Sequence, residues 1–564
     1  MKKVCSLFLA ALLLTGCSKA PVAEVTVPET TAAPTVPAET EAAPYVSQFV
    51  KETRISLSDE GINVEGNQEA VTTSHDIVCY ENRDSYDSGN PYGEGSDADK
   101  HTAEEAAAHT VVNITRAGAY RVTGKLSAGQ IRIDLGNDAY YDPEAVVELI
   151  LDNAEITCTV APAILFQNVY ECDGNWAVET ARADVDTTAA GANLILEGSS
   201  RVHGSYVAKI YKDAEGQKKL VKQDGAIYSY MSMNVHGTGA LELIAENEGL
   251  DTELHLTINS GDIRILADND GINTNEDGVS VTTVNGGNLT IYAGLGEEGD
   301  GIDSNGYLVI NGGYVYSSAK PIADAGLDSD LGSFIHGGTV IATGSTMDWA
   351  ESDSRQVTMN LQFAQQQAAG AKITVKDETG AEIFSFEDDS QYARGFRGLI
   401  LSHSAFAVGD TYSIYADDAQ LAYSGTSVGG FPGGFGGRGP QDFDPSQMPE
   451  GFEPGRMPEG FEMPEGFDPS QRGERPDGFQ PGQRGERPEG FEMPEGFDPS
   501  QMPGGERGEM PEGFDPSQFG GRPQRGEGMT PPEGMEGGAS AEAEPSTGFY
   551  MSDKVNAFSG VTTA

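Results

Sequence analysis

Residues 297–318 read EEGDGIDSNGYLVINGGYVYSS, and the words of this stretch recur along the chain. A turn, a short strand, a tight Asn-Gly-Gly turn and a second short strand follow one another. Four segments align on one apolar position: NEGLDTE from 247, NDGINTN from 269, GDGIDSN from 299 and DAGLDSD from 324. QDGAIYSY from 223 is a looser fifth copy, with one extra residue after its glycine. The aligned apolar residues, spaced 22 to 30 residues apart, are Ile227, Leu250, Ile272, Ile302 and Leu327.

The tight turns repeat in step with these apolar residues. They end on glycines spaced 22 to 26 residues apart, namely Gly239, Gly261, Gly287, Gly313 and Gly338. Glycine permits the positive φ that other residues resist. The period is too short for a propeller blade, lacks a leucine-rich consensus and is too β-rich for helical repeats. It predicts an all-β protein built as a parallel β-helix (solenoid), in which each strand pairs with its equivalents about 4.8 Å above and below.

The flanking sequence divides into further parts. Stretches 120–136, 145–168 and 192–204 show an irregular form of the strand-turn-strand pattern, and we expect the solenoid over 120–350. The exposed strand edges at the ends of a solenoid must be covered. We therefore expect an N-terminal cap with an insertion over 50–119 and a small C-terminal β cap over 351–427.

The chain opens with MKKVCSLFLAALLLTGC, in which two lysines precede an apolar run. The run is too short to cross a bilayer, which is typical of a signal peptide. Its ending, Leu14-Thr15-Gly16-Cys17, resembles the bacterial lipobox. We expect a signal peptide over 1–16, lipidation of Cys17, and an extracytoplasmic protein held at the cell surface by its lipid alone. The alternative is an ordinary secretory signal in which Cys17 is incidental.

Two segments have compositions that cannot form a core. Residues 17–49 are rich in Pro, Thr, Glu and Ala and are expected to form a disordered stalk. Residues 428–545 repeat Pro-Glu-Gly-Phe words and are expected to form a long disordered tail. This tail is either a spacer or a segment in contact with the cell wall. Residues 546–564 regain apolar character and are expected to dock on the cap.

Charge and cysteine content narrow the range of partners. The chain has 88 acidic and 35 basic residues, a formal charge of −53. Nucleic acid is excluded as a partner because binding phosphates needs a basic face, whereas cations are favoured. The acidity has a second explanation, the solubility of an exported protein. Cys158 and Cys172 are close enough in sequence to form a disulfide, or they are buried thiols, and their spacing is not that of a metal site.

Acidic and amide side chains recur at equivalent positions of the repeat. Strand alternation that turns Ile302 inward turns Asp303 outward, so stacked coils align these side chains in columns. Aligned like charges repel unless a counter-ion lies between them. Ca²⁺ prefers such oxygen ligands, although Asp and Asn also favour turns for local reasons. The predicted calcium ligands are Asp251, Glu253, Asp270, Asn273, Asp300, Asp303, Asn305, Asp328 and Asp330.

The stretch from LTINSGDIRILADNDGIN to EEGDGIDSNGYLVINGGYVYSSA resembles the bacterial carbohydrate-binding-domain-containing β-helix proteins. The resemblance covers roughly residues 50–425 and is strongest over 223–345. It implies a pectate-lyase-like right-handed solenoid in a secreted or lipidated protein. It also implies an association with Ca²⁺ and binding of cellulose and acidic plant polysaccharide such as polygalacturonate.

Three functions remain open: a calcium-assisted polysaccharide-binding lipoprotein, a polysaccharide lyase or hydrolase on the same fold, and an adhesin or spacer without a sugar ligand. A lyase needs a basic residue to abstract a proton. Residues 225–345 contain only two, Arg264 and Lys320, against 17 acidic residues, which favours binding over cleavage. No catalytic residue is assigned. Tyr314 and Tyr316 share a strand face and are the candidate carbohydrate platform, the alternative being that they are simply strand formers.

Overall fold

The computed structural model describes residues 45–77, 103–212, 218–296, 298–321, 324–345, 349–387, 391–392, 394–428 and 545–564. Within these ranges the chain is almost entirely β-strand, and the one α-helix, α1 (Ala103–Ala107), is short. The all-β prediction is confirmed. No helix among the described residues has the length and apolar character needed to cross a membrane. The predicted signal peptide, Cys17, most of the stalk and most of the tail lie outside the described residues.

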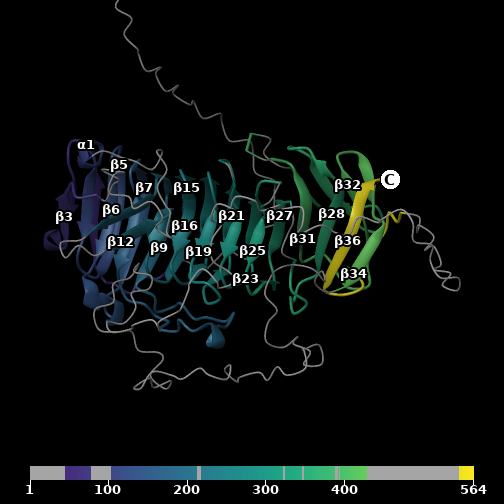
Figure 1. Cartoon of the computed structure of the whole chain (residues 1–564), viewed down its shortest axis with the longest axis horizontal. Helices are drawn as coiled ribbons and strands as arrows, with labels where there is room; N and C mark the ends of the chain where they lie inside the picture. Colours follow the sequence, from purple (N-terminus) through teal and green to yellow (C-terminus); the bar gives the residue numbers. More distant parts are fainter. Residues whose placement is uncertain are drawn as a thin grey trace, which may run out of the picture. The chain divides into compact units, whose positions relative to one another are not determined.

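Most strands belong to three parallel ladders, which the chain visits in turn (Figure 1). The first ladder begins with β3 (Val71–Ser74), which pairs antiparallel with the next strand, and every later pairing in it is parallel. It continues with β4 (Thr110–Ile114), β6 (Gly129–Asp134), β8 (Ile164–Asn168), β13 (Gly225–Ser229), β16 (Glu248–Thr252), β19 (Ile272–Thr274), β22 (Ile302–Ser304) and β25 (Leu327–Ser329).

The second ladder is formed by β1 (Glu52–Leu57), β5 (Gly118–Leu126), β7 (Val147–Thr157), β9 (Ala192–Glu197), β14 (Met233–Gly237), β17 (Leu256–Ile258), β20 (Val281–Val284), β23 (Tyr307–Ile310) and β26 (Gly332–Ile335). β2 (Asn63–Glu65) pairs antiparallel with β1 at its outer edge. The third ladder leaves the end of β7 and continues through β10 (Ser199–Gly204), β15 (Ala240–Ala245), β18 (Asp262–Ala267), β21 (Asn288–Tyr292), β24 (Tyr314–Ser318) and β27 (Thr339–Gly344).

The register of the first ladder is the one that the repeat predicts. Ile227 pairs with Leu250, and the pairing continues through Ile272 and Ile302 to Leu327. All five side chains are fully buried in the main core. A slip of one residue would turn each of them outward, so the buried face specifies the register.

The Asn-Gly-Gly turns stack as closely as the strands do. Gly287, Gly313 and Gly338 have φ values of 86°, 83° and 87°. A Cβ atom on Gly313 would lie 2.6 Å from the carbonyl oxygen of Gly287, and one on Gly338 would lie 2.5 Å from that of Gly313. Both the left-handed backbone and the stacking of neighbouring turns therefore require glycine.

The ends of the ladders differ from the predicted boundaries. Residues 110–114 and 118–119, expected in the N-terminal cap, already belong to β4 and β5. Residues 45–49, expected in the disordered stalk, instead lie on the sheet, where Tyr45 and Phe49 pack against Ile150 and Ile195. The apolar rings of this segment explain the difference, because they cover outward-facing aliphatic side chains that would otherwise meet water.

A C-terminal module follows the last coil. β27 pairs antiparallel with β31 (Phe396–Ser402), which pairs with β28 (Thr358–Gln367). The final strand, β36 (Val555–Thr563), lies parallel to β28, although more than 180 residues separate them in the sequence (Figure 1). The module is completed by β29 (Lys372–Lys376), β30 (Glu382–Glu387), β32 (Thr411–Ala416), β33 (Ala419–Ala422), β34 (Gly425–Val428) and β35 (Phe549–Tyr550).

Cys158 and Cys172 are free thiols, so the disulfide interpretation is wrong, and the alternative of a buried thiol holds for Cys158 only. Cys158 is fully buried in the main core at the end of β7, and burial raises the pKa of its thiol to about 12. Cys172 lies beyond β8, beside Glu171, and is partly exposed. Cys158 therefore lies inside the apolar core, whereas Cys172 lies in a loop beside a carboxylate, so the two thiols are in different environments.

Candidate functional site

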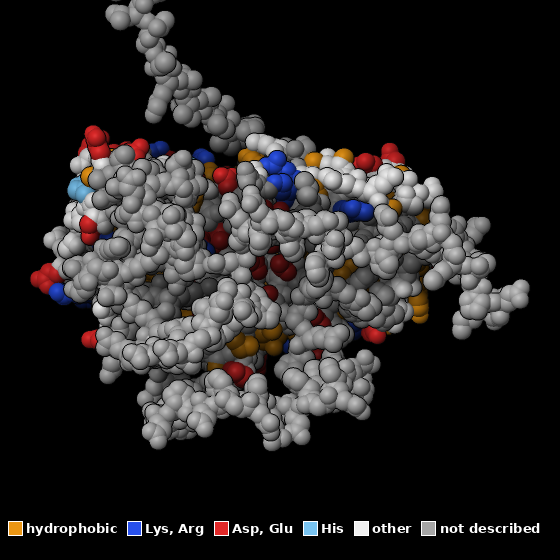
Figure 2. Space-filling model, viewed as in Figure 1, with side chains coloured by type: hydrophobic (Ala, Val, Ile, Leu, Met, Phe, Trp, Pro, Cys, Tyr) orange, Lys and Arg blue, Asp and Glu red, His pale blue; other side chains and the backbone are white. Residues whose placement is uncertain are grey.

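Carboxylates line the outer face of the first ladder and the turns that lead into it. We call this set the acidic row. Figure 2 shows acidic side chains gathered near the middle of the visible face. The members are Asp224, Glu248, Asp251, Asp270, Asp300, Asp303 and Asp328.

The strand members follow the predicted alternation. Asp251 is in register with Asn273, Asn273 with Asp303, and Asp303 with Asp328. Each of these residues follows a fully buried aliphatic residue. The repeat therefore brings the predicted column together, one side chain per coil.

The turn members bind the backbone of the next coil. Oδ1 of Asp270 accepts a hydrogen bond from the backbone N–H of Asp300 at 2.7 Å. Oδ1 of Asp300 in turn accepts one from the backbone N–H of Ala325. These bonds stack the turns, and the second oxygen of each carboxylate remains for another partner.

The tightest group of carboxylates lies at the N-terminal end of the row. One ligand atom from each of Asp224, Glu248 and Asp251 lies within 4.8 Å of the others, and all three side chains are buried. Oδ2 of Asp251 has no hydrogen-bond partner, and neither has Oδ1 of the neighbouring Asn273. Lys222 lies 2.6 Å from Asp224. Buried oxygens that lack partners are costly, so this arrangement suits an added cation.

Burial and mutual repulsion raise the pKa values along the row. Desolvation, with repulsion from Asp251 and Asp224, raises the pKa of Glu248 well above its usual range. Desolvation and Glu248 do the same for Asp270. The pKa of Asp300 and that of Asp303 are each raised to about 7, mainly by desolvation, with nearby aspartates adding to the effect. The side chains of the acidic row therefore resist being ionised at the same time. A bound cation would stabilise their charged carboxylate forms.

The remaining predicted ligands have other partners. Oε1 of Glu253 accepts a hydrogen bond from the hydroxyl of Tyr228. Nδ2 of Asn305 donates to the backbone oxygen of Asn275 at 2.9 Å. Asp330 is exposed at the open end of the row.

The structure also brings in two carboxylates that the predicted set lacks, Asp224 and Glu248. Both precede the glycine of their repeat, as Asp270 and Asp300 do. That position is the signal that identifies them. In the sequence, the extra residue between Gly225 and Ile227 shifts Asp224 by one position relative to Glu248 when the copies are aligned on Ile227 and Leu250, which pair in register. The equivalence of the two carboxylates is therefore not apparent from that alignment.

The predicted tyrosine platform is wrong. Tyr316 is 3% exposed, with its ring 5.5 Å from that of Tyr292 and 6.4 Å from that of Phe386. The C-terminal module covers this face of the third ladder, and Tyr314 packs at the edge of the same cluster. A sugar cannot stack on a ring that the protein already covers.

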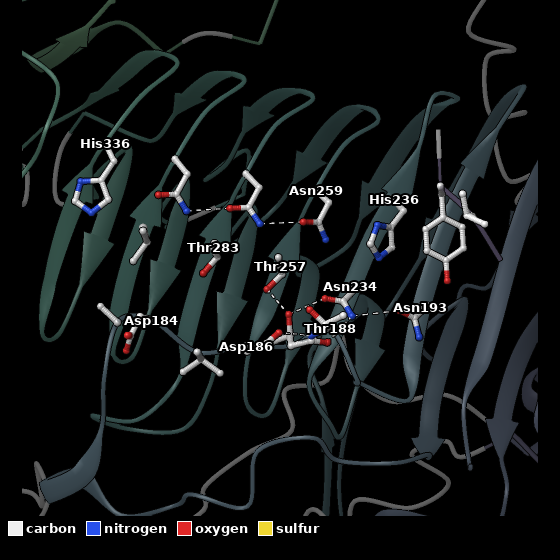
Figure 3. Close-up of a pocket in the computed structure, with 18 of the residues that line it drawn as sticks. Asp184, Asp186, Thr188, Asn193, Asn234, His236, Thr257, Asn259, Thr283 and His336 are labelled. Atoms are coloured by element: carbon white, nitrogen blue, oxygen red, sulfur yellow. Dashed lines mark hydrogen bonds between the residues drawn. The ribbon is translucent and has the colours of Figure 1, made fainter. Parts of the chain in front are cut away.

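A groove of about 690 Å³ lies on the outer face of the second ladder. In Figure 3, His236, Asn259 and His336 follow one another along its floor. A second line of side chains, Asn193, Asn234, Thr257 and Thr283, runs beside the first. The loop at 183–188 forms one wall and carries Asp184 and Asp186, both exposed (Figure 3).

Three asparagines on the groove floor bind one another. Nδ2 of Asn285 donates to Oδ1 of Asn259 at 2.9 Å, and Nδ2 of Asn311 donates to Oδ1 of Asn285 at 2.9 Å. We call these three residues the amide row. Each precedes a stacked turn, so the turn geometry gives the three side chains the same height and direction.

Hydrogen bonds hold the wall of the groove to the sheet. The hydroxyl of Thr187 lies 2.7 Å from Oδ1 of Asn234 and 2.7 Å from the hydroxyl of Thr257. Nδ2 of Asn234 donates to the backbone oxygen of Thr187 at 2.8 Å. The wall is thus fixed over the second line of side chains, and the amide row stays open beside it.

The sequence contains the signal for this groove in the residue before each tight turn. That residue is polar in five successive coils: His236, Asn259, Asn285, Asn311 and His336. The wall has no such signal, because it comes from an insertion outside the repeat.

Together, the three parallel ladders, the acidic row and the open polar groove define a class of repetitive all-β protein with extended binding surfaces. A family model for carbohydrate-binding domain-containing proteins matches residues 108–395, and the chain belongs to this family. A search of curated proteins finds no match. Among solved structures, the polysaccharide lyase-like protein from C. thermocellum, as its gadolinium derivative, is similar with a TM-score of 0.30 and 19% identity, over 53% of this chain and 96% of that one.

Proposed function

We propose that this protein binds polysaccharide, with calcium on the acidic row assisting the binding of acidic chains. The fold proposed for this function is a right-handed parallel β-helix with a C-terminal β cap. Membership of a carbohydrate-binding family supports a polysaccharide partner in general. The observation that supports the calcium is the group of three buried carboxylates within 4.8 Å of one another, beside oxygens without partners.

The donor atoms fit calcium better than they fit other metals. The acidic row supplies carboxylates, and Asn273 adds an amide oxygen. Calcium takes six to eight oxygen ligands in flexible geometry, whereas zinc and copper prefer Cys and His. The bound ion would supply positive charge that offsets the repulsion among the carboxylates. Asp224, Glu248 and Asp251 would hold one such ion, and Asp270, Asp300, Asp303 and Asp328 offer further ligands.

The same charge argument favours a uronate polymer as one partner. Its carboxylates would be repelled by a bare acidic row. At the C-terminal end of the row Asp300, Asp303 and Asp328 are only partly buried, so a ligand can approach them. Calcium there would attract the polymer.

Binding is favoured over cleavage by the position of Arg264, a basic residue that a lyase mechanism would recruit. Its guanidinium lies over the rings of Tyr292 and Tyr392, 5.2 Å and 5.0 Å from their centres. It belongs to the contact between the third ladder and the C-terminal module. Lyase or hydrolase activity is the second candidate, and release of unsaturated or reducing sugar ends would reveal it. An adhesin or spacer without a sugar ligand is the third.

Asp303→Asn is expected to weaken polygalacturonate binding in millimolar calcium about tenfold, or ~1.4 kcal/mol. The change keeps the shape and one oxygen but removes a charge from the row. Asp138→Asn is the matched control, because Asp138 is exposed on the 3-10 helix η3 (Asn137–Tyr141), outside the row. Titration calorimetry with and without chelator measures the effect. Equal affinity in calcium and in chelator would contradict calcium assistance.

We further propose that the mature protein is a lipoprotein at the cell surface, joined to the membrane through Cys17. Cys17→Ala is expected to release the protein or to leave an unprocessed precursor. Membrane fractionation and gel mobility measure the outcome. Wild-type fractionation and mobility of the variant would show that Cys17 carries no lipid.

A further inference from the structure

We propose that the groove on the second ladder binds a neutral glycan chain, independently of calcium and of the acidic row. The inference shares with the proposed function only the expectation that a ligand is a polysaccharide. The two sites lie on different ladders and differ in chemistry. One is a row of carboxylates, and the other is a floor of amides, imidazoles and hydroxyls.

The groove has the length and repeat of an extended polymer. Its floor follows the second ladder from β9 to β26, through the parallel pairings of β14, β17, β20 and β23. Five steps of about 4.8 Å give roughly 24 Å. One step is close to the length of one sugar unit in an extended chain. Equivalent hydroxyls of successive sugars can therefore meet equivalent side chains of successive coils.

The amide row provides donors that are already oriented. An asparagine side chain has two N–H donors and a carbonyl oxygen. The bonds within the row use one N–H of Asn285 and one of Asn311, which leaves the second N–H of each for a ligand. Because the neighbouring amides already hold one another in place, these asparagine side chains would lose little conformational entropy when a glycan binds.

The charge of the groove favours a neutral ligand. Burial lowers the pKa of His236 and, with help from Arg355, that of His336, so both imidazoles are uncharged at neutral pH. The charged residues that line the groove are Asp184 and Asp186 on the wall and Arg355, so acidic groups outnumber basic ones. The hydroxyl and backbone N–H of Thr188 lower the pKa of Asp186 and keep it ionised. Carboxylates accept hydrogen bonds from sugar hydroxyls but repel a uronate chain.

Tyr45 closes the N-terminal end of the groove. Its ring lies 4.5 Å from that of His236, and its hydroxyl donates to the buried Glu148 at 2.8 Å. The backbone N–H of Gln48 donates to the same carboxylate at 2.9 Å. An anchored aromatic ring beside a polar floor offers a face on which the terminal sugar can stack.

The test uses the full mature chain in chelator and neutral hexasaccharides of β-1,4-linked glucose, mannose and xylose, with hexagalacturonate for comparison. At least one neutral hexasaccharide is expected to bind. Asn285→Ala and His336→Ala are expected to weaken that binding about tenfold or more. Asn288→Ala is the matched control, an exposed asparagine three residues away that lies on β21 of the third ladder.

Three results would overturn the proposal. The first is that no neutral hexasaccharide binds. The second is unchanged affinity in both groove variants. The third is a lower melting temperature in Asn285→Ala with unchanged affinity, which would make the amide row purely structural. If Asn285→Ala fails to fold, His336→Ala still decides, because it breaks no bond of the amide row. Asp303→Asn should leave neutral binding unchanged, so the two sites fail or succeed separately.

Discussion

Deleting residues 545–564 is expected to unfold the C-terminal module. β36 pairs with β28 on one side and with β34 and β33 on the other, so its loss would break three pairings. The deleted segment also buries five large apolar side chains, each no more than 3% exposed: Phe549, Met551, Val555, Phe558 and Val561. At roughly 1.5–3 kcal/mol for each, the loss is on the order of 10 kcal/mol. That is comparable to the whole stability of a typical domain.

A point substitution tests the same packing more gently. Phe558→Ala is expected to cost about 3–5 kcal/mol, because its ring lies 4.8 Å from that of Tyr423 and 5.0 Å from that of Phe549. Tyr550→Ala is the matched control, an aromatic residue of β35 that is 52% exposed. Urea unfolding followed by circular dichroism measures both. Unchanged unfolding of the deletion variant would mean that the last strand adds nothing to the module.

The repeat allowed the strand register to be predicted because two independent periods agree. Strand alternation fixes which side chains face the core, and the turn glycines fix where each strand ends. Ile302 pairs with Leu327, and Gly313 adopts a left-handed turn stacked on Gly287, as the sequence predicts. The same logic placed Asp303 beside Asp328.

The covering of the third ladder was harder to predict, because a module distant in the sequence supplies it. Tyr316 faces outward, as the alternation predicts, but the C-terminal module packs over it. A signal does exist, since Leu266, Tyr292 and Ile341 are also apolar on that outer face. A strand that is apolar on both faces indicates burial on both faces.

The burial of Asp251 and the wall of the groove have no comparable signal in the repeat. Asp251 faces outward yet is fully buried, beside Lys222 and Asp224 from a copy with an extra residue. The wall at 183–188 belongs to an insertion whose place depends on hydrogen bonds to Asn234 and Thr257. Such contacts between an insertion and a sheet depend on the folded arrangement rather than on any local period.

In chelator, the melting temperature is expected to fall as the pH rises from about 4.5 to about 8. The pKa of Asp300 and that of Asp303 are raised from 3.8 to about 7. The folded state therefore binds more protons than the unfolded state in this window, and its stability falls as the pH rises through about 7. A full shift of three units would be about 4 kcal/mol per group. Because the two groups interact, we expect on the order of 5 kcal/mol in total, or roughly 10 °C.

Calcium should reverse this loss where the carboxylates are ionised. A ligand that binds only the folded state stabilises it by about 2.7 kcal/mol at a hundredfold excess over its Kd. Calcium should therefore raise the melting temperature at about pH 8 and have little effect at about pH 4.5, where protons compete for the same oxygens. Asp303→Asn should reduce both the fall with pH and the gain from calcium, whereas Asp138→Asn should change neither. Scanning calorimetry of both variants, at both pH values and with and without calcium, measures the fall with pH and the gain from calcium. Only a desolvated, mutually repelling set of carboxylates links the binding of protons and calcium to folding. A melting temperature that changes with neither pH nor calcium would therefore mean that the acidic row consists of solvated turn residues.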